Sequence, residues 1–267
     1  MVFLALVGSF FALPFVYAIM QSLKPMEEIF IFPPRFFVRN PTSENFYLLS
    51  QYAGNTWVPF TRYLFNSLFV TSTATFLQVV ICSMCAFILA KGKIAGKKII
   101  YAIITLTLLF SYEVTAVPSY VVMAGMQLVN SYFALILPAI AVPLGLFLMK
   151  QYIDASVPDA LLEAAKMDGA GVVRTFWAIV MPIVKPAWMT LALFSFRDLW
   201  SIMPSGTIFS EELKTLPYVM STISAGGIAR AGSAMAASVI MMIPPIIIYW
   251  ITQSNVMETM SSAGIKD

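Results

Sequence analysis

Six runs of mostly apolar residues constrain the fold of this chain more than any other feature of its sequence. Each is close to the roughly 20 residues that an α-helix needs to cross the hydrocarbon core of a bilayer. Charged residues make up only 11% of the chain, against about 25% in an ordinary soluble domain. The sequence therefore predicts an all-α polytopic membrane protein with six transmembrane helices, at approximately 2–22, 63–90, 99–123, 131–149, 183–203 and 231–252.

The first run, residues 2–22, also has the apolar character of a signal peptide. It shows no clear cleavage site of small residues, and it is longer than the usual apolar core of such a peptide. We therefore interpret it as a retained span, and residues 1–267 as a single transmembrane domain.

The positions of the lysines predict the orientation of the spans. Residues 91–98, KGKIAGKK, carry four lysines in eight positions, and short loops rich in Lys and Arg stay in the cytoplasm. This places both chain termini inside, together with the loop 150–182 and the tail 253–267. The segments 24–61, 124–130 and 204–230 then lie outside. The five prolines of 24–61 predict an irregular segment, and the length of 204–230 favours contact with a partner.

The residue types that most hydrolytic enzymes need are missing. The chain has no histidine, which removes Ser-His and Cys-His pairs and histidine metal clusters. Cys82 and Cys85 lie inside an apolar run, and we interpret them as small buried residues rather than as a redox or metal pair. The net charge of +3 is small, and nothing in its placement indicates binding to nucleic acid.

A phosphate-binding loop is missing as well. Gly92 and Gly96 are separated by three residues rather than the four of such a loop, and Lys98 stands where a Ser or Thr is required. The chain is therefore predicted not to be an enzyme and to bind no cofactor. Any energy for transport must come from an ion gradient or from a separate subunit.

Three ionisable residues fall inside predicted spans: Glu113, Arg197 and Asp198. Such groups are costly in lipid and usually face protein or water. Glu113 and Arg197 each lie 14 positions beyond the inner end of their span, so both stand about 21 Å along it at 1.5 Å per residue. We predict that they form a charge pair, and that Asp198 points elsewhere.

The stretch 154–182 is a polar, helix-forming segment between long apolar runs. Ser156 and Asp159 have the spacing of a capping pair, which predicts that a helix starts at this point. Asp168-Gly169 predicts its end, because glycine adopts the left-handed backbone conformation without penalty. The intervening helix should present a narrow apolar face made of Leu161, Leu162, Ala164 and Ala165.

The same stretch carries a family resemblance. EAAKMDGAG, residues 163–171, followed by IVMP at 179–182, resembles the cytoplasmic EAA loop of permease subunits of ATP-binding-cassette importers. The flanking sequences LILPAIAVPLGLFLMKQYIDASVPDALLEAA and VKPAW, and the ending QSNVMETMSSAGIKD, resemble more narrowly the carbohydrate-type permeases, such as the smaller permease subunit of the maltose transporter. Lys166 and Met167 depart mildly from the pattern.

The resemblance implies a multi-pass subunit of a bacterial plasma-membrane complex that imports a carbohydrate by alternating access. Its partners would be a second permease, two ATPase subunits that bind ATP and Mg, and an extracytoplasmic solute-binding protein that contacts 204–230. The loop would form a coupling helix seated in a cleft of the ATPase, and residues 262–267 would reach the same interface. The coupling positions would be Glu163, Ala164, Ala165, Asp168, Gly169 and Pro182.

Two alternatives remain open at this point. An ion-coupled secondary transporter would use Glu113, Arg197 and Asp198 as a relay, although the sequence shows no inverted repeats. Glu163 could also pair with Lys166 on its own helix rather than with a partner. The sequence does not identify the solute, and no solute-binding residue is assigned.

Overall fold

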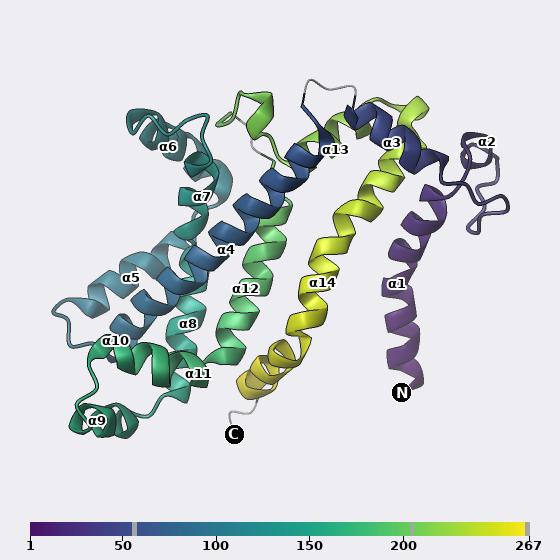
Figure 1. The fold of residues 1–267 in the computed structure, drawn as a ribbon. Helices are drawn as coiled ribbons and strands as arrows, with labels where there is room; N and C mark the ends of the chain where they lie inside the picture. The colour runs from purple at the N-terminus through teal and green to yellow at the C-terminus, as the bar shows by residue number, and fades with distance from the viewer. Residues whose placement is uncertain (55–57, 204–205, 265–267) are drawn as a thin grey trace. The chain divides into compact units, whose positions relative to one another are not determined.

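The computed structural model describes residues 1–54, 58–203 and 206–264, without the side chains of 112–113 and 258–264. Within these ranges every regular element is a helix (Figure 1). The chain forms two compact units by contact, Met1–Ser67 with Ser210–Ile246, and Leu68–Phe209 with Ile247–Asp267. Helices α4 and α14 each contribute to both units.

The first unit contains the predicted external segment 24–61 and most of the predicted external segment 204–230. Its elements are α1 (Val2–Ser22), α2 (Met26–Ile29), α3 (Glu44–Gly54), the start of α4 (Phe60–Lys91), η2 (Glu211–Leu213), α13 (Leu216–Ser224), η3 (Ile228–Arg230) and the start of α14 (Ala231–Gly264). Helix α1 has no polar face, and every side chain from residue 2 to residue 17 is exposed. A 21-residue helix that is mostly apolar and mostly exposed is suited to lipid rather than to water.

The predicted irregular segment 24–61 is more ordered than its prolines indicated. Residues 44–54 form helix α3, and three buried polar side chains fasten the stretch before it. The Lys24 ammonium donates to the carbonyl of Arg35, and the Glu28 carboxylate accepts from the backbone N–H of Arg39 at 2.9 Å. The Asn45 amide donates to the carbonyls of Ser22 and Lys24 at 2.8 and 2.7 Å. Sequence patterns missed this segment because its order depends on contacts between residues far apart in the chain.

The second unit is built around α4, α8 and α12. Its elements after α4 are α5 (Lys97–Thr107), α6 (Tyr112–Gly125), α7 (Phe133–Ile140), α8 (Pro143–Ser156), α9 (Asp159–Met167), α10 (Val172–Thr175), the π-helix η1 (Phe176–Val180), α11 (Met181–Ile183) and α12 (Lys185–Trp200). Its core cluster consists of Val79, Cys82, Ala86, Phe87, Met149, Ile153, Val157, Phe176, Val180, Met181, Val184, Ala187 and Leu191. Cys82 is buried as predicted, but Cys85 is exposed, because it lies on the face of α4 that points away from this cluster.

Four helical segments are long and apolar enough to cross a membrane among the described residues: Val2–Ser22, Phe60–Lys91, Phe133–Ser156 and Ile228–Met257. A fifth is obtained if Val172–Ile183 and Lys185–Trp200, which meet at 81°, count as one span. The predicted span 99–123 is divided between α5 and α6, because Ser111 has an extended backbone (φ −75°, ψ 159°) and interrupts the helix. The structure therefore shows an all-α polytopic protein with four to five candidate spans.

Candidate functional site

Helix α9 begins two residues later than the capping pair predicted. Ser156 is the last residue of α8, Pro158 precedes α9, and no side chain caps the first turn. The prediction that Ser156 caps this helix is therefore wrong. The physical reason is Pro158, which favours an extended conformation in the residue before it. Val157 adopts φ −110° and ψ 102°, so the chain bends there and not at Ser156.

The predicted end of α9 is confirmed. The helix stops at Met167, and Gly169 has φ +78°. The N–H of Ala170 donates to the carbonyl of Ala165 at 2.9 Å, and the N–H of Gly169 donates to the carbonyl of Lys166 at 3.1 Å. This pair of bonds is the Schellman motif, in which a left-handed glycine satisfies the last carbonyls of a helix.

The apolar face of α9 is narrower than predicted. Ala165 is buried, and Leu162 packs partly buried against the core cluster. Leu161 and Ala164 were predicted on the same face, but both are exposed. A nine-residue helix turns 100° per residue, so only one position per turn reaches the core when the helix lies at its edge.

The outer surface of α9 and the following residues combines apolar and charged side chains. Met167 is 88% exposed, and Val172 and Val173 are 70% and 69% exposed. Glu163, Asp168 and Pro182 are also exposed. No ion pair joins Glu163 to Lys166 among the residues described. This surface presents large apolar side chains to solvent outside the predicted spans, which is typical of a surface that binds a partner.

One ion pair fixes the start of α9 to the end of α4. The Lys91 ammonium lies 2.8 Å from a carboxylate oxygen of Asp159. The hydrogen bond from Lys91 and its positive charge lower the pKa of Asp159 below its usual value. Sequence reasoning missed this contact because the two residues are 68 positions apart.

The predicted intramembrane pair of Glu113 and Arg197 remains a prediction, because the side chain of Glu113 lies outside the described residues. Arg197 and Asp198 lie near the end of α12, and both are exposed. The predicted contacts of residues 262–267 likewise fall where no side chain is described.

A second group of polar contacts lies in the first unit, where residues 211–216 are held against the first two turns of α4. The Asn66 amide donates to the carbonyls of Glu212 and Lys214 at 2.7 and 2.9 Å. The Tyr63 hydroxyl bonds to the Glu211 carboxylate at 3.0 Å. Asn66 and Tyr63 are both fully buried, at 0% exposure. Asn66 was a signal in the sequence, since a buried amide inside an apolar helix needs partners.

Further contacts complete this attachment. The Ser67 hydroxyl accepts from the N–H of Leu216 at 2.7 Å. The Lys214 ammonium bonds to Glu211 at 2.5 Å and to the Tyr218 hydroxyl at 2.9 Å. Burial lowers the pKa of Lys214, but the hydrogen bonds to Glu211 and Tyr218 and the charge interactions with the same two groups together outweigh it and raise the pKa above its usual value.

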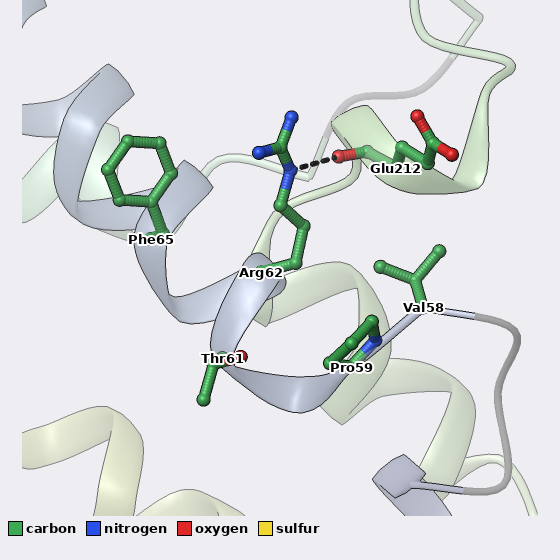
Figure 2. A pocket seen from close by; sticks show the side chains of 6 residues that line it. All are labelled: Val58, Pro59, Thr61, Arg62, Phe65 and Glu212. Carbon is green, nitrogen blue, oxygen red and sulfur yellow. Dashed lines mark hydrogen bonds between the residues drawn. The ribbon is translucent and has the colours of Figure 1, made fainter.

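An open hollow of about 540 Å³ lies beside this attachment (Figure 2). The Arg62 Nε donates to the carbonyl of Glu212 at 3.4 Å, and its guanidinium lies 5.9 Å from the centre of the Phe65 ring. The hollow is lined by Val58, Pro59, Thr61, Arg62, Phe65 and Glu212. It offers one aromatic face and two charged side chains at the surface of the first unit.

The sequence of this chain is similar to those of known permease proteins. No protein-family model matches the chain. It is 26% identical to the arabinooligosaccharides transport system permease protein AraQ of Halalkalibacterium halodurans, over 99% of this chain and 93% of that protein. It is 30% identical to the sn-glycerol-3-phosphate transport system permease protein UgpE of Yersinia enterocolitica, over 75% of this chain and 72% of that protein.

Its fold resembles a chain in the crystal structure of a bacterial ABC transporter involved in the import of the acidic polysaccharide alginate. The TM-score is 0.80 at 20% identity, over 95% of this chain and 93% of that chain. The fold and these relatives define a transport-system permease. The chain belongs to the permease subunits of carbohydrate-uptake ATP-binding-cassette importers.

Several predictions are thereby confirmed. The chain is a multi-pass protein of the bacterial plasma membrane. It is a non-catalytic subunit without a cofactor of its own, because in this family a partner ATPase hydrolyses ATP. Family membership favours the importer over an ion-coupled secondary transporter.

Proposed function

We propose that α9 is the coupling helix through which ATPase subunits drive this permease. The observation that carries the proposal is the exposed surface of α9, which holds a carboxylate, a small residue and large apolar side chains outside the core cluster. Exposed Ala164 permits close approach of a partner backbone, and exposed Glu163 can pair with a cationic group of the ATPase. Buried Ala165 holds the helix on the permease, while Asp168 and Gly169 end it.

The proposed complex contains this chain, a second permease subunit, two ATPase subunits and an extracytoplasmic solute-binding protein. Its orientation is the one predicted by the lysines of 91–98, with both termini, the loop 150–182 and the tail 253–267 in the cytoplasm. We propose six spans within a single transmembrane domain, with α5 and α6 together forming the sixth. The segment 204–230 would face the solute-binding protein.

The proposed solute is an oligosaccharide or a related sugar derivative. Support comes from the arabinooligosaccharide permease of Halalkalibacterium halodurans, a relative that matches nearly the whole chain. The glycerol-3-phosphate relative has a higher identity over a shorter stretch, so a small phosphorylated polyol is the alternative that a binding assay must separate. Titration of the cognate solute-binding protein with arabinooligosaccharides and with glycerol-3-phosphate distinguishes the two.

The proposed mechanism is a shift between inward-facing and outward-facing populations. ATP binding closes the two ATPase subunits, and the closing movement pushes the coupling helices together. The spans shift from the inward-facing to the outward-facing conformation because the closed ATPase pair binds the outward-facing state more tightly. In this chain the push is received by α9 and passed through Leu162 to the core cluster.

Measurements of uptake and ATP hydrolysis by the reconstituted importer test the coupling role of α9. Glu163→Ala and Gly169→Pro are each expected to reduce uptake per ATP hydrolysed or to weaken retention of the ATPase during purification. Glu27→Ala is the matched control, because Glu27 is an exposed glutamate on a short helix of the first unit. Full transport by both α9 variants would overturn the proposal.

We also propose that Glu113 and Arg197 form an intramembrane charge pair. Exchange of the two charges tests it. Glu113→Arg and Arg197→Glu are each expected to impair uptake, and the double variant is expected to recover it in part. Equal impairment in the double variant and the single variants would count against direct pairing.

A further inference from the structure

Two kinds of side-chain contact attach α9 to the rest of the second unit among the residues that the structure describes. Leu162 packs against the core cluster, and Ala165 is buried, so these two residues form the apolar side of the attachment. The Lys91–Asp159 ion pair provides the polar contact, and it is the only hydrogen bond or ion pair of an α9 side chain within the described part of the chain. The orientation of α9 therefore depends on few atoms.

The ion pair is placed where both helices favour its charges. Lys91 is the last residue of α4, and Asp159 is the first residue of α9. A cation is stabilised at the C-terminus of a helix and an anion at the N-terminus. The charge of Lys97 also contributes to the lowered pKa of Asp159. The geometry thus joins the negative end of one helix dipole to the positive end of another.

The loop 91–98 is folded so that Lys91 is free to make this contact. The Lys97 ammonium donates to the carbonyls of Ala90 and Gly92, both at 3.3 Å, and so satisfies the end of α4. Gly92 donates to the carbonyl of Ile88 at 2.8 Å, and a Cβ on Gly92 would lie 2.4 Å from that oxygen. The turn is therefore fixed by glycine and Lys97, and the Lys91 side chain is only 13% exposed although Asp159 is 79% exposed.

We infer that Lys91 and Asp159 are positioning residues that set the angle of α9 relative to α4. Asp159 lies six positions before Ala165, which corresponds to about 9 Å along the helix. Two attachments at this separation prevent α9 from pivoting about its apolar contact. A push on α9 then moves the end of α4 as well, instead of only tilting α9. This inference rests on the proposed coupling role of α9.

Stability is a poor alternative explanation for the pair. An ion pair with one strongly exposed partner contributes little to folding, because water and salt screen it. Loss of the Lys91–Asp159 ion pair should therefore reduce the coupling of transport to ATP hydrolysis without preventing assembly of the permease with its ATPase subunits. This difference allows the positioning role to be measured.

The test uses the complete importer, with both permeases, the ATPases and the solute-binding protein, in liposomes. Lys91→Met and Asp159→Asn remove the charge from either side of the pair. Each is expected to lower the number of solute molecules moved per ATP hydrolysed by about threefold or more. Purified complexes of both variants should keep their ATPase subunits, and Lys91→Arg should restore the ratio.

Lys93→Met is the matched control, because Lys93 is an exposed lysine of the same loop for which no ion pair is described. Unchanged coupling in Lys91→Met and Asp159→Asn, or an equal loss in Lys93→Met, would overturn the inference. Loss of the ATPase subunits from both variants would also overturn it, since the pair would then serve assembly. If Glu163→Ala in parallel leaves coupling intact, the coupling role of α9 itself fails, which separates that failure from failure of the ion pair alone.

Discussion

Two connecting segments of this permease are attached in opposite ways. Residues 211–216 are held to α4 by four side chains, Arg62, Tyr63, Asn66 and Ser67, of which the last three are buried. Helix α9 has a single described polar attachment, through an ion pair that is largely exposed on one side. Segments with few buried contacts open and move at lower free-energy cost than segments with many. The comparison indicates that residues 211–216 are held rigidly and that α9 is adjustable.

The largest effect is expected from Asn66→Leu, which removes the amide that bridges two carbonyls. Leucine has a similar size but leaves the carbonyls of Glu212 and Lys214 without this donor. The Glu212 carbonyl keeps the Arg62 donor and loses one hydrogen bond worth about 1 kcal/mol, whereas loss of the donor to the Lys214 carbonyl costs about 1 to 3 kcal/mol, so the free energy of unfolding should fall by about 2 to 4 kcal/mol.

Thermal unfolding in detergent measures this loss, and hydrogen exchange should locate it in α13. Gln51→Leu is the control, because Gln51 is an exposed amide on α3. If the Asn66→Leu variant were as stable as the wild type, these hydrogen bonds would not be what holds residues 211–216 rigidly.

The second prediction is that substitutions of two neighbouring alanines of α9 have different effects. Ala165 is 6% exposed, whereas Ala164 is exposed. Ala165→Leu should destabilise the attachment of α9 by about 1 to 3 kcal/mol, because extra volume in a packed core forces neighbours to shift. Ala164→Leu should leave folding unchanged and weaken only the binding of the ATPase.

Hydrogen exchange of α9 and retention of the ATPase during purification distinguish these outcomes. Equal effects of the two substitutions on exchange would mean that α9 is not oriented as the structure has it.

A smaller effect is expected at the end of α9. Gly169→Ala places a side chain at φ +78°, which costs about 1 to 2 kcal/mol for a residue other than glycine. The last turn of α9 should therefore fray, and its amides should exchange faster. Gly171→Ala is the matched control, because Gly171 has φ −70° and open space around its Cα. Similar exchange in both variants would contradict the Schellman motif.

The smallest effect concerns pH. The pKa of Asp159 is lowered in the folded protein by Lys91 and, to a lesser extent, by Lys97. A carboxyl with a lowered folded pKa stabilises the structure above its unfolded pKa, and this contribution is lost as the pH falls through the folded pKa. The protection of amides at the start of α9, taken relative to their intrinsic exchange rates at each pH, should therefore decrease as the pH is lowered toward that range. Asp159→Asn should exchange faster at neutral pH and lose this part of the pH dependence; an unchanged profile would show that the ion pair does not hold α9.

Much of the candidate site was readable from local sequence. Gly169 predicted the end of α9 because the left-handed conformation is a property of one residue and its neighbours. The EAA resemblance indicated the family for a similar reason, since its motif lies in one contiguous stretch. The start of the helix was predicted wrongly because Ser156 and Asp159 have the spacing of a cap, while Pro158 between them decides the backbone of Val157.

The exposure of single residues was harder to predict. Leu161 and Leu162 are adjacent and equally apolar, yet only Leu162 packs against the core cluster's surroundings. Cys82 and Cys85 share a span, yet only Cys82 is buried. Which side of an apolar helix meets protein and which meets lipid is not encoded in hydropathy, because both environments accept the same side chains.

The sequence by itself determined that this is an all-α membrane protein without hydrolytic chemistry of its own. Composition and the length of each apolar run decide whether a segment lies in lipid or in water. It also determined where α9 ends and which family the chain resembles. Only the tertiary structure decided that 99–123 is divided between two helices, that Asn66 holds residues 211–216, and that Lys91 meets Asp159. These features join residues up to about 150 positions apart, and such contacts depend on how helices pack rather than on local pattern.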